Sequence, residues 1–183
     1  MKTIIVLTFF GILGCTFCTA PETHVPTGPE HCRDVYKEAD PNFKRDQFYT
    51  GSWYLTHAKY RNHSKTQCTT FEMTSQPLQI KFDEDTLRVT CTGTVQQGAR
   101  HTDYKCKAAE GSTTKYEYES IVSVVESDYK DYATVYMCMK TGNKGDNVYV
   151  LSRTKTRQPS EAEKNSLEKL GETLEDFVKF TCT

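Results

Sequence analysis

The chain lacks a surplus of charge of either sign. Its 183 residues include 23 Lys and Arg and 24 Asp and Glu, which gives a formal net charge of −1 at pH 7. Proteins that bind nucleic acid or an anionic membrane surface mostly carry a marked excess of basic residues. The balance therefore argues against a nucleic-acid partner and against a membrane-surface partner.

Long apolar runs are also missing, except for one near the N-terminus. Lys2 precedes a mostly apolar stretch over residues 4–13, and small residues follow up to Ala20. This pattern is typical of a secretory signal peptide, and the stretch is too short to span a bilayer. We therefore predict that residues 1–20 are a signal peptide and that the protein is secreted and extracellular. Cleavage after Ala20 and cleavage after Cys18 both stay open.

Internal repeats and low-complexity segments are absent as well, which predicts that residues 21–183 form a single domain. Residues 21–47 begin with a Pro-rich, polar stretch and are expected to form a loose N-terminal arm. Residues 48–157 are expected to form the folded body, and residues 158–183 a helix and tail.

Closely spaced cysteine pairs of the kind that hold zinc are lacking outside the signal peptide, where Cys15 and Cys18 lie. Six cysteines remain in a chain bound for an oxidising compartment, so three disulfides and no metal site are predicted. Six cysteines alone allow fifteen pairings. They are Cys32, Cys68, Cys91, Cys106, Cys138 and Cys182.

Catalytic constellations are lacking too. His57 and His63 are six residues apart, and His101 and Asp103 are two residues apart. Neither arrangement supplies a nucleophile with a base, a carboxylate pair or a metal site. We therefore expect these histidines at the surface and do not expect an enzyme.

Short stretches of alternating apolar and polar residues, separated by turn-forming residues, fill the middle of the chain. Eight strands joined by short loops predict an all-β protein, an antiparallel up-and-down meander that closes into an eight-stranded β-barrel. Such a barrel has room for side chains or for one small ligand. The expected strands cover residues 53–60, 67–74, 78–83, 87–96, 99–108, 115–126, 132–141 and 147–155.

The end of the chain changes to a helical period. Ser160 followed by Glu163 indicates a capping box, and Gly171 is a position at which the helix can kink or end. We expect a C-terminal α-helix that packs one apolar face on the outside of the barrel. The apolar residues of that face are Leu167, Leu170, Leu174, Phe177 and Val178.

The chain has a single tryptophan, Trp53, two residues after Gly51 at the start of the first expected strand. This Gly-x-Trp pattern, the signal peptide, the eight strands, Arg153 in the last strand and the following helix together resemble the lipocalin family. The resemblance implies that Trp53 closes the floor of the barrel and that Arg153 packs across its ring as a cation–π pair. Gly51, Trp53 and Arg153 are therefore expected to be structural.

The segments FYTGSWYLTH, DYATVYMC and VYVLSRTK, with a cysteine after the last helix, narrow the resemblance. They resemble the salivary lipocalins of blood-feeding triatomine bugs, the group that includes triabin, pallidipin and the nitrophorins. This resemblance implies the pairings Cys32–Cys138, Cys68–Cys182 and Cys91–Cys106, the last of which is similar to the triabin branch.

Haem is a separate question, because the nitrophorins bind it through a histidine after the second strand. The local match LQIKFDEDT places Lys81 where that histidine would be expected. An ammonium group has no lone pair at neutral pH and is a poor axial ligand. Haem is therefore disfavoured, and no cofactor is expected.

The resemblance leaves two functions open. In the first, the barrel of a secreted monomer sequesters a small host mediator and so inhibits platelet aggregation and haemostasis. ADP or another nucleotide, a biogenic amine and an eicosanoid are the candidate mediators. In the second, the outer surface binds and inhibits a host clotting protease, as triabin does.

Aromatic and methyl-bearing residues at alternate strand positions favour the first function. Cationic residues would support an anionic mediator if they point inwards. Which face of each strand points inwards stays open, because a shift of one residue inverts the set. The candidate ligand contacts are Tyr116, Tyr118, Val135 and Met137, with the cations Lys81, Arg88 and Lys105.

One N-x-S/T sequon, at Asn62 in RNHSK, lies just beyond the first expected strand. We predict glycosylation at this site. An accessible motif is necessary for the modification but not sufficient, so its occupancy stays open.

Overall fold

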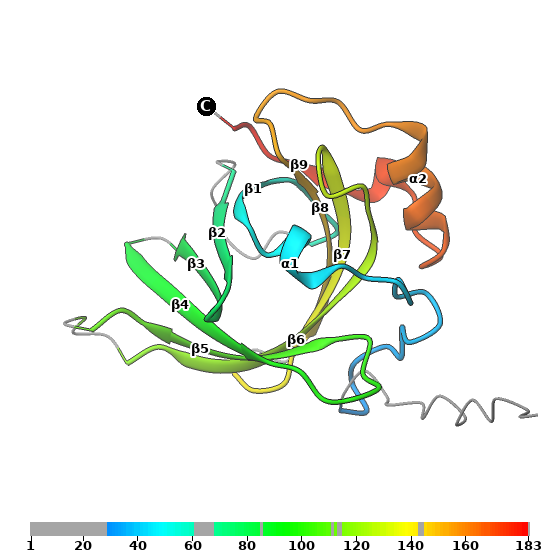
Figure 1. Cartoon of the computed structure of the whole chain (residues 1–183). Coiled ribbons are helices and arrows are strands. Elements are labelled where there is room, and N and C mark those ends of the chain that lie inside the picture. The colour runs from blue at the N-terminus through cyan, green and yellow to red at the C-terminus, as the bar shows by residue number, and fades with distance from the viewer. Residues whose placement is uncertain are drawn as a thin grey trace, which may run out of the picture.

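Antiparallel strands form a closed barrel, in which each strand pairs with the one that follows it in the sequence. The strands are β1 (Gly51–Ala58), β2 (Thr70–Ser75), β3 (Leu78–Glu84), β4 (Leu87–Thr94), β5 (Thr102–Ala108), β6 (Glu117–Ser127), β7 (Tyr132–Met139) and β8 (Gly145–Ser152). β1 pairs with both β2 and β8, so the sheet closes on itself (Figure 1). The predicted eight-stranded up-and-down barrel is confirmed.

The structure, a computed structural model, describes residues 29–60, 68–84, 86–110, 112, 115–142 and 145–182. The predicted signal peptide, residues 1–20, and the sequon at Asn62 lie outside these ranges and stay predictions. No helix within the described ranges is long and apolar enough to cross a membrane.

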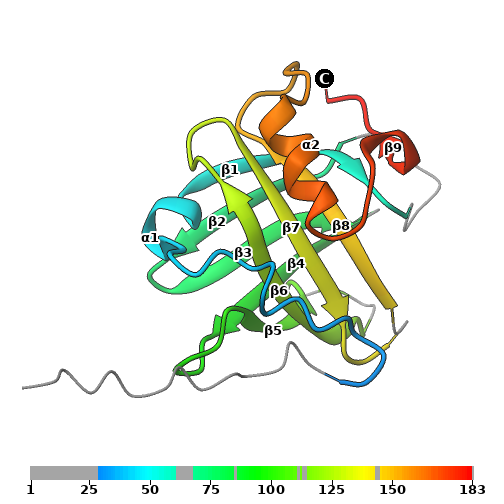
Figure 2. The ribbon, with the colours of Figure 1, turned by 90° about the vertical axis from the view of Figure 1, so that its right-hand side faces the viewer.

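β7 shows why the barrel has two cores. Its sequence, YATVYMCM, consists mostly of β-branched, aromatic and sulfur-containing residues, and both faces of the strand are buried. Val135 belongs to the cluster inside the barrel, whereas its neighbour Tyr136 belongs to a second cluster outside it. The N-terminal arm adds Val35 to this outer cluster, and the helix α2 (Glu161–Glu168) adds Leu167. Figure 2 shows α2 and the blue N-terminal arm lying over this side of the barrel.

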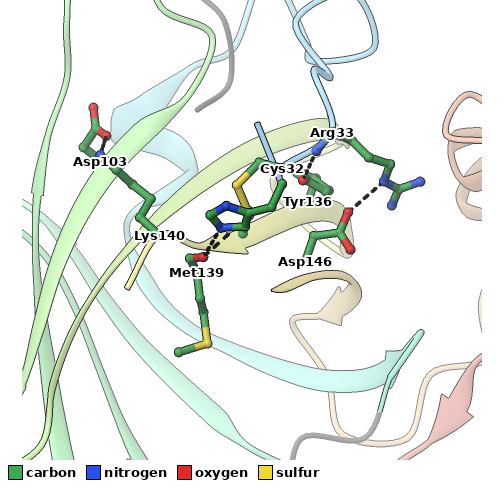
Figure 3. The surroundings of a disulfide bond; sticks show 9 residues. Cys32, Arg33, Asp103, Tyr136, Met139, Lys140 and Asp146 are labelled. Carbon is green, nitrogen blue, oxygen red and sulfur yellow. Dashed lines mark hydrogen bonds and ion pairs between the residues drawn. A yellow bond between two sulfur atoms is a disulfide. The ribbon is translucent and has the colours of Figure 1, made fainter. Parts of the chain in front are cut away.

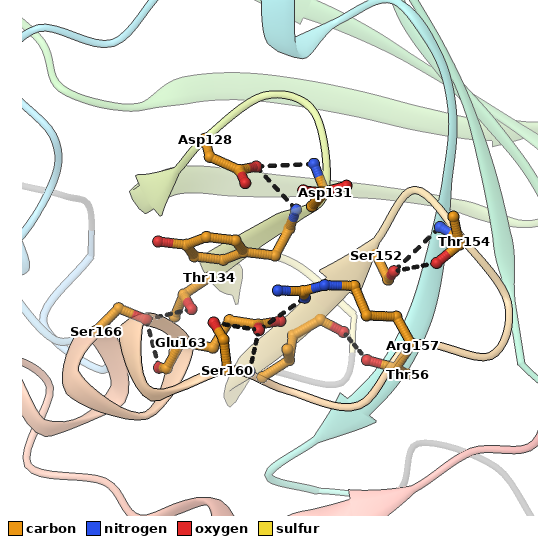
Figure 4. A network of polar contacts seen from close by, with 12 residues as sticks. Thr56, Asp128, Asp131, Thr134, Ser152, Thr154, Arg157, Ser160, Glu163 and Ser166 are labelled. Carbon is orange, nitrogen blue, oxygen red and sulfur yellow. Dashed lines mark hydrogen bonds and ion pairs between the residues drawn. The ribbon is translucent and has the colours of Figure 1, made fainter.

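The helix α2 begins as predicted. Glu163 accepts a hydrogen bond from the backbone N–H of Ser160 at 2.6 Å, which completes the capping box. The Thr134 and Ser166 hydroxyl oxygens lie 2.5 Å apart and join the helix to β7 (Figure 4). Arg157 donates to the Glu163 carboxylate at 2.7 Å, so this buried charge is paired.

The C-terminal region departs from the prediction after α2. Gly171 has φ of +70°, and a residue in this left-handed conformation does not continue a helix. The chain then makes a 3-10 turn, η1 (Leu174–Asp176), and a two-residue strand, β9 (Val178–Lys179), that pairs with β1. The prediction of one helical face as far as Val178 is therefore wrong. Leu174 and Phe177 still pack on the outer cluster, but Val178 packs on the inner one.

Three disulfides link distant parts of the chain, in the pairings that the resemblance implies. Cys32–Cys138 joins the N-terminal arm to β7, Cys68–Cys182 joins the approach to β2 to the C-terminus, and Cys91–Cys106 joins β4 to β5.

Hydrogen bonds beside the Cys32–Cys138 disulfide hold the N-terminal arm on the outer face of the barrel (Figure 3). The backbone N–H of Arg33 donates to the Tyr136 hydroxyl at 2.8 Å, and Arg33 Nε donates to Asp146 at 2.9 Å. His31 lies next to the two sulfur atoms, but these are bonded to each other and are not thiolates that could bind a metal.

Candidate functional site

One end of the barrel is closed by Trp53, whose side chain is fully buried. Its indole N–H donates to the carbonyl of Phe48 at 2.9 Å. The guanidinium carbon of Arg153 lies 3.7 Å from the centre of the indole ring. Arg153 also donates to the carbonyls of Thr50 (2.5 Å) and Ser52 (2.9 Å), so the cation has oxygen partners as well as an aromatic face.

Gly51, the first residue of β1, lies at this closed end. Its φ of +70° is a backbone conformation that residues with a side chain rarely adopt. A Cβ added there would lie 3.8 Å from Nη1 of Arg153, so space does not exclude a side chain. The requirement for glycine at this position is therefore conformational.

The interior holds a cavity of about 530 Å³. Most of the side chains that line it are apolar or aromatic, and they come from every strand of the barrel. A cavity of this size and composition suits one small, largely apolar molecule. The apolar and aromatic lining includes Phe48, Leu55, Phe71, Met73, Ile80, Phe82, Val122, Val135, Met137, Met139, Tyr149, Leu151 and Phe180.

Hydroxyl groups supply further polarity along the wall of the cavity. Tyr104, Tyr118 and Ser120 line it and are nearly inaccessible to solvent. The Tyr104 hydroxyl lies close to that of Tyr49, whereas the Tyr118 hydroxyl has no hydrogen-bond partner among the described residues. Burial raises the pKa of both phenols, so both remain protonated. They are neutral groups able to donate a hydrogen bond to a ligand.

Charged side chains in the described lining lie toward the open end. Tyr116 donates to the Glu84 carboxylate at 2.7 Å. Arg88 donates to Asp83 at 3.1 Å and also donates to Glu72. Two carboxylates therefore already neutralise this cation.

The structure separates the candidate ligand contacts into two groups. It brings Tyr116, Tyr118, Val135 and Met137 together in the cavity lining, with Arg88 at the charged end.

Lys81 and Lys105 are not in the described lining, and the expectation that they support a ligand is corrected. Lys81 is exposed, and its neighbours Ile80 and Phe82 line the cavity instead. The side chain of Lys105 is 81% exposed and lies 3.4 Å from Glu119. The alternation of the strands directs both ammonium groups to the solvent side.

The histidines also differ from the expectation. His57 and His101 are buried rather than at the surface, and neither is in the described cavity lining. Burial lowers the pKa of each imidazole; Lys179 lowers that of His57 further, while Asp103 partly offsets the effect at His101. His63 lies outside the described residues.

Phe180 is a cavity residue that the sequence analysis missed. It lies beyond the predicted helical face, in the tail that follows Gly171, and it lines the cavity with 8% of its surface exposed. The alternation of Phe180 with the flanking polar Lys179 and Thr181 is the signal for an extended segment with one buried face.

Comparisons with known proteins agree with this architecture. The sequence model of the triabin family matches residues 22–165. Dimiconin of Triatoma dimidiata is 35% identical over 169 residues, which cover 85% of this chain and 80% of that protein. Triabin of Meccus pallidipennis is 26% identical over 165 residues, which cover 85% of this chain and 94% of that protein.

Two solved structures are also similar. LTBP1 in complex with leukotriene C4 is 26% identical, with a TM-score of 0.73, over 86% of this chain and 99% of that one. The amine-binding protein of Rhodnius prolixus in its tryptamine complex is 22% identical, with a TM-score of 0.65, over 77% and 82% of the two chains. At 22% identity, the similarity to the amine-binding protein shows a shared fold and nothing more.

Proposed function

This chain belongs to the triabin family of lipocalins, and from that premise we propose that it is a secreted salivary protein whose barrel sequesters a small lipid mediator of the host. An oxygenated fatty acid of the eicosanoid class is the mediator that the cavity suits best. Removal of such a signal would inhibit platelet aggregation and haemostasis. Because binding is stoichiometric, the protein acts without turnover.

The observation that carries the proposal is the distribution of polarity in the cavity. Apart from the charged groups toward the open end, the described lining is apolar, with neutral hydroxyls such as those of Tyr118 and Ser120. A hydrocarbon chain gains free energy from burial against such a wall. A hydroxyl or carboxyl group of the lipid can meanwhile accept a hydrogen bond from a buried phenol, which otherwise has no partner.

A nucleotide fits this lining less well. Phosphate groups require cationic partners, and Arg88 is the sole cationic side chain in the described lining. Its guanidinium is already paired with Asp83 and Glu72, and further carboxylate charge from Glu84 would repel a phosphate.

A biogenic amine is the second candidate, and a specific observation favours it. Glu84 stands beside Tyr116, whose ring contacts that of Tyr118 at 5.4 Å between centroids. A carboxylate next to aromatic faces can hold an ammonium group. Such a ligand would bind near the open end rather than deep in the barrel.

Competition with a fluorescent fatty acid separates these candidates. The purified protein is loaded with cis-parinaric acid and titrated with leukotriene C4, arachidonic acid, serotonin and ADP. We expect the two lipids to displace the probe at least about tenfold more effectively than serotonin or ADP. Isothermal titration with serotonin and ADP then detects binding that leaves the probe in place.

Preferred binding of serotonin or ADP would overturn the lipid assignment. If none of the four ligands binds and the protein prolongs plasma clotting, the function is inhibition of a host clotting protease, as in the second hypothesis from the sequence.

A further inference from the structure

The wall of the barrel has a gap in its regular pairing between β1 and β2. β1 pairs with β2 over Gly51–Tyr54, and the Leu55 N–H still donates to Thr69 at 2.9 Å. From His57 onwards β1 pairs with β9 instead. Toward the open end, the place beside β1 is therefore taken by the C-terminal tail, residues 178–182.

The tail is hydrogen-bonded on both of its sides. The Phe180 N–H donates to the carbonyl of Thr56 in β1 at 2.8 Å. The Cys68 N–H, in the approach to β2, donates to the carbonyl of Thr181 at 3.1 Å. The Cys68–Cys182 disulfide fixes the same edge covalently. The tail thus bridges β1 and the approach to β2, as its course beside these strands in Figure 1 shows.

The side chain of Phe180 extends from the tail to the cavity side of the barrel wall. It is buried in the inner cluster, to which Leu55 and Ala58 of β1 also belong, and all three residues line the cavity. Phe177, three residues earlier, is equally buried but packs on the outer cluster. Two similar phenylalanines of one segment therefore lie on opposite sides of the barrel wall.

We propose that the C-terminal tail is a part of the ligand-binding wall and that Phe180 is a specificity-determining residue, which limits the length of the lipid chain that the cavity accepts. This inference rests on the proposed lipid function. The Phe180 ring occupies space that a longer chain would need, and the Cys68–Cys182 disulfide holds it there. A shorter side chain at this position enlarges the cavity without changing its apolar character.

The test compares Phe180→Ala with the matched control Phe177→Ala. Saturated fatty acids of 12, 16 and 20 carbons compete with cis-parinaric acid on each purified, folded variant. We expect Phe180→Ala to shift the ratio of affinities for the 20-carbon and 12-carbon acids by about tenfold in favour of the longer acid. Phe177→Ala should keep the wild-type ratio. An unchanged ratio in Phe180→Ala, or the same change in both variants, would overturn the inference while the lipid function stands.

A second measurement does not depend on lipid binding. In the Cys68→Ser/Cys182→Ser variant, hydrogen exchange at the backbone amides of Leu55, position 68 and Phe180 should accelerate by more than about tenfold. The amide of Tyr104, on the distant strand β5, should keep its protection. If the wild-type protein binds no fatty acid, the lipid function fails, and this exchange still tests whether the disulfide holds the tail in the wall. Unchanged exchange at the three amides would show that the tail stays in place without the disulfide and would overturn the proposed role of the disulfide in holding Phe180.

Discussion

On the outer face of β7, the buried polar groups of Thr134 and Tyr136 have partners, whereas on the inner face of the neighbouring strand β6 a buried phenol has none in the described part of the chain. Tyr136 accepts a hydrogen bond from Arg33, and Thr134 is bonded to Ser166. Tyr118, on the inner face, is nearly as buried but has no such partner. The outer bonds hold the N-terminal arm and α2 on the barrel. The inner hydroxyl is left available for a molecule that is not part of the chain.

This difference teaches that burial alone does not distinguish a structural residue from a functional one. Leaving a buried polar group without a partner costs free energy, and the cost is recovered when a ligand supplies the partner. Substitutions on the outer face should therefore change stability, and substitutions on the inner face should change affinity.

The largest effect is expected from Leu167→Ala in α2. Leu167 is fully buried against the outer cluster, and its truncation should cost about 2 to 5 kcal/mol of unfolding free energy because a cavity remains. Denaturant unfolding measures this cost. The affinity of the folded protein for cis-parinaric acid should match the wild type; a large loss of affinity would show that the two faces are not separable.

Tyr136→Phe should have the next largest effect. It removes the acceptor of the Arg33 N–H without creating a cavity, so we expect a loss of about 1 to 3 kcal/mol in stability. Thermal and denaturant unfolding check the loss, with Tyr54→Phe as a more exposed control. Lipid affinity should again stay constant, since Tyr136 lies outside the barrel.

Tyr118→Phe reverses this pattern. The substitution removes a hydroxyl that has no partner in the described structure, so stability should stay within about 0.5 kcal/mol of the wild type. Affinity for leukotriene C4 should fall about fivefold, or about 1 kcal/mol, because one hydrogen bond to the ligand is lost. Calorimetric titration measures the change. Equal affinity in the two proteins would mean that this phenol does not contact the ligand.

The smallest effect is expected from pH. Burial lowers the folded-state pKa of His57 and of His101 below the value of about 6.5 that histidine has in an unfolded chain. The folded state therefore binds fewer protons in this range, and stability present above about pH 6.5 should be lost as the pH falls toward the folded-state pKa. Thermal midpoints at pH 7.5 and 5.5 should show this decrease, and His57→Gln should reduce it. An equal decrease in the variant would exclude His57 as a cause.

Much of the fold was predictable because its signals are local. Alternating apolar residues and turn residues predicted the eight strands, and the position of Trp53 after Gly51 predicted the closed end through the resemblance. The inward face of β7 could not be predicted in the same way. Both faces of that strand are buried, so Val135 and Tyr136 do not show the contrast between apolar and polar side chains that marks the inward face of a half-buried strand.

The tail was mispredicted for a different reason. Its apolar residues fit a helical period, and the positive φ of Gly171 separates them into two segments that pack on opposite sides of the wall. The sequence shows the glycine but not where the chain goes after it. That direction depends on the part of β1 that does not pair with β2 and is therefore free to pair with the tail. This pairing is a property of the assembled barrel. Phe180 could therefore be recognised as a cavity residue only in three dimensions.

The two long-range disulfides have a consequence for proteolysis. Cys32–Cys138 and Cys68–Cys182 close overlapping loops that together span the chain from residue 32 to residue 182. Any single cut by an endopeptidase in this span falls inside at least one loop, so the two fragments remain covalently joined. Under the proposed function each copy captures one molecule of its target, and no catalytic cycle makes up for a degraded copy. One cut by a host protease would then leave the fragments of this barrel in a single covalent piece.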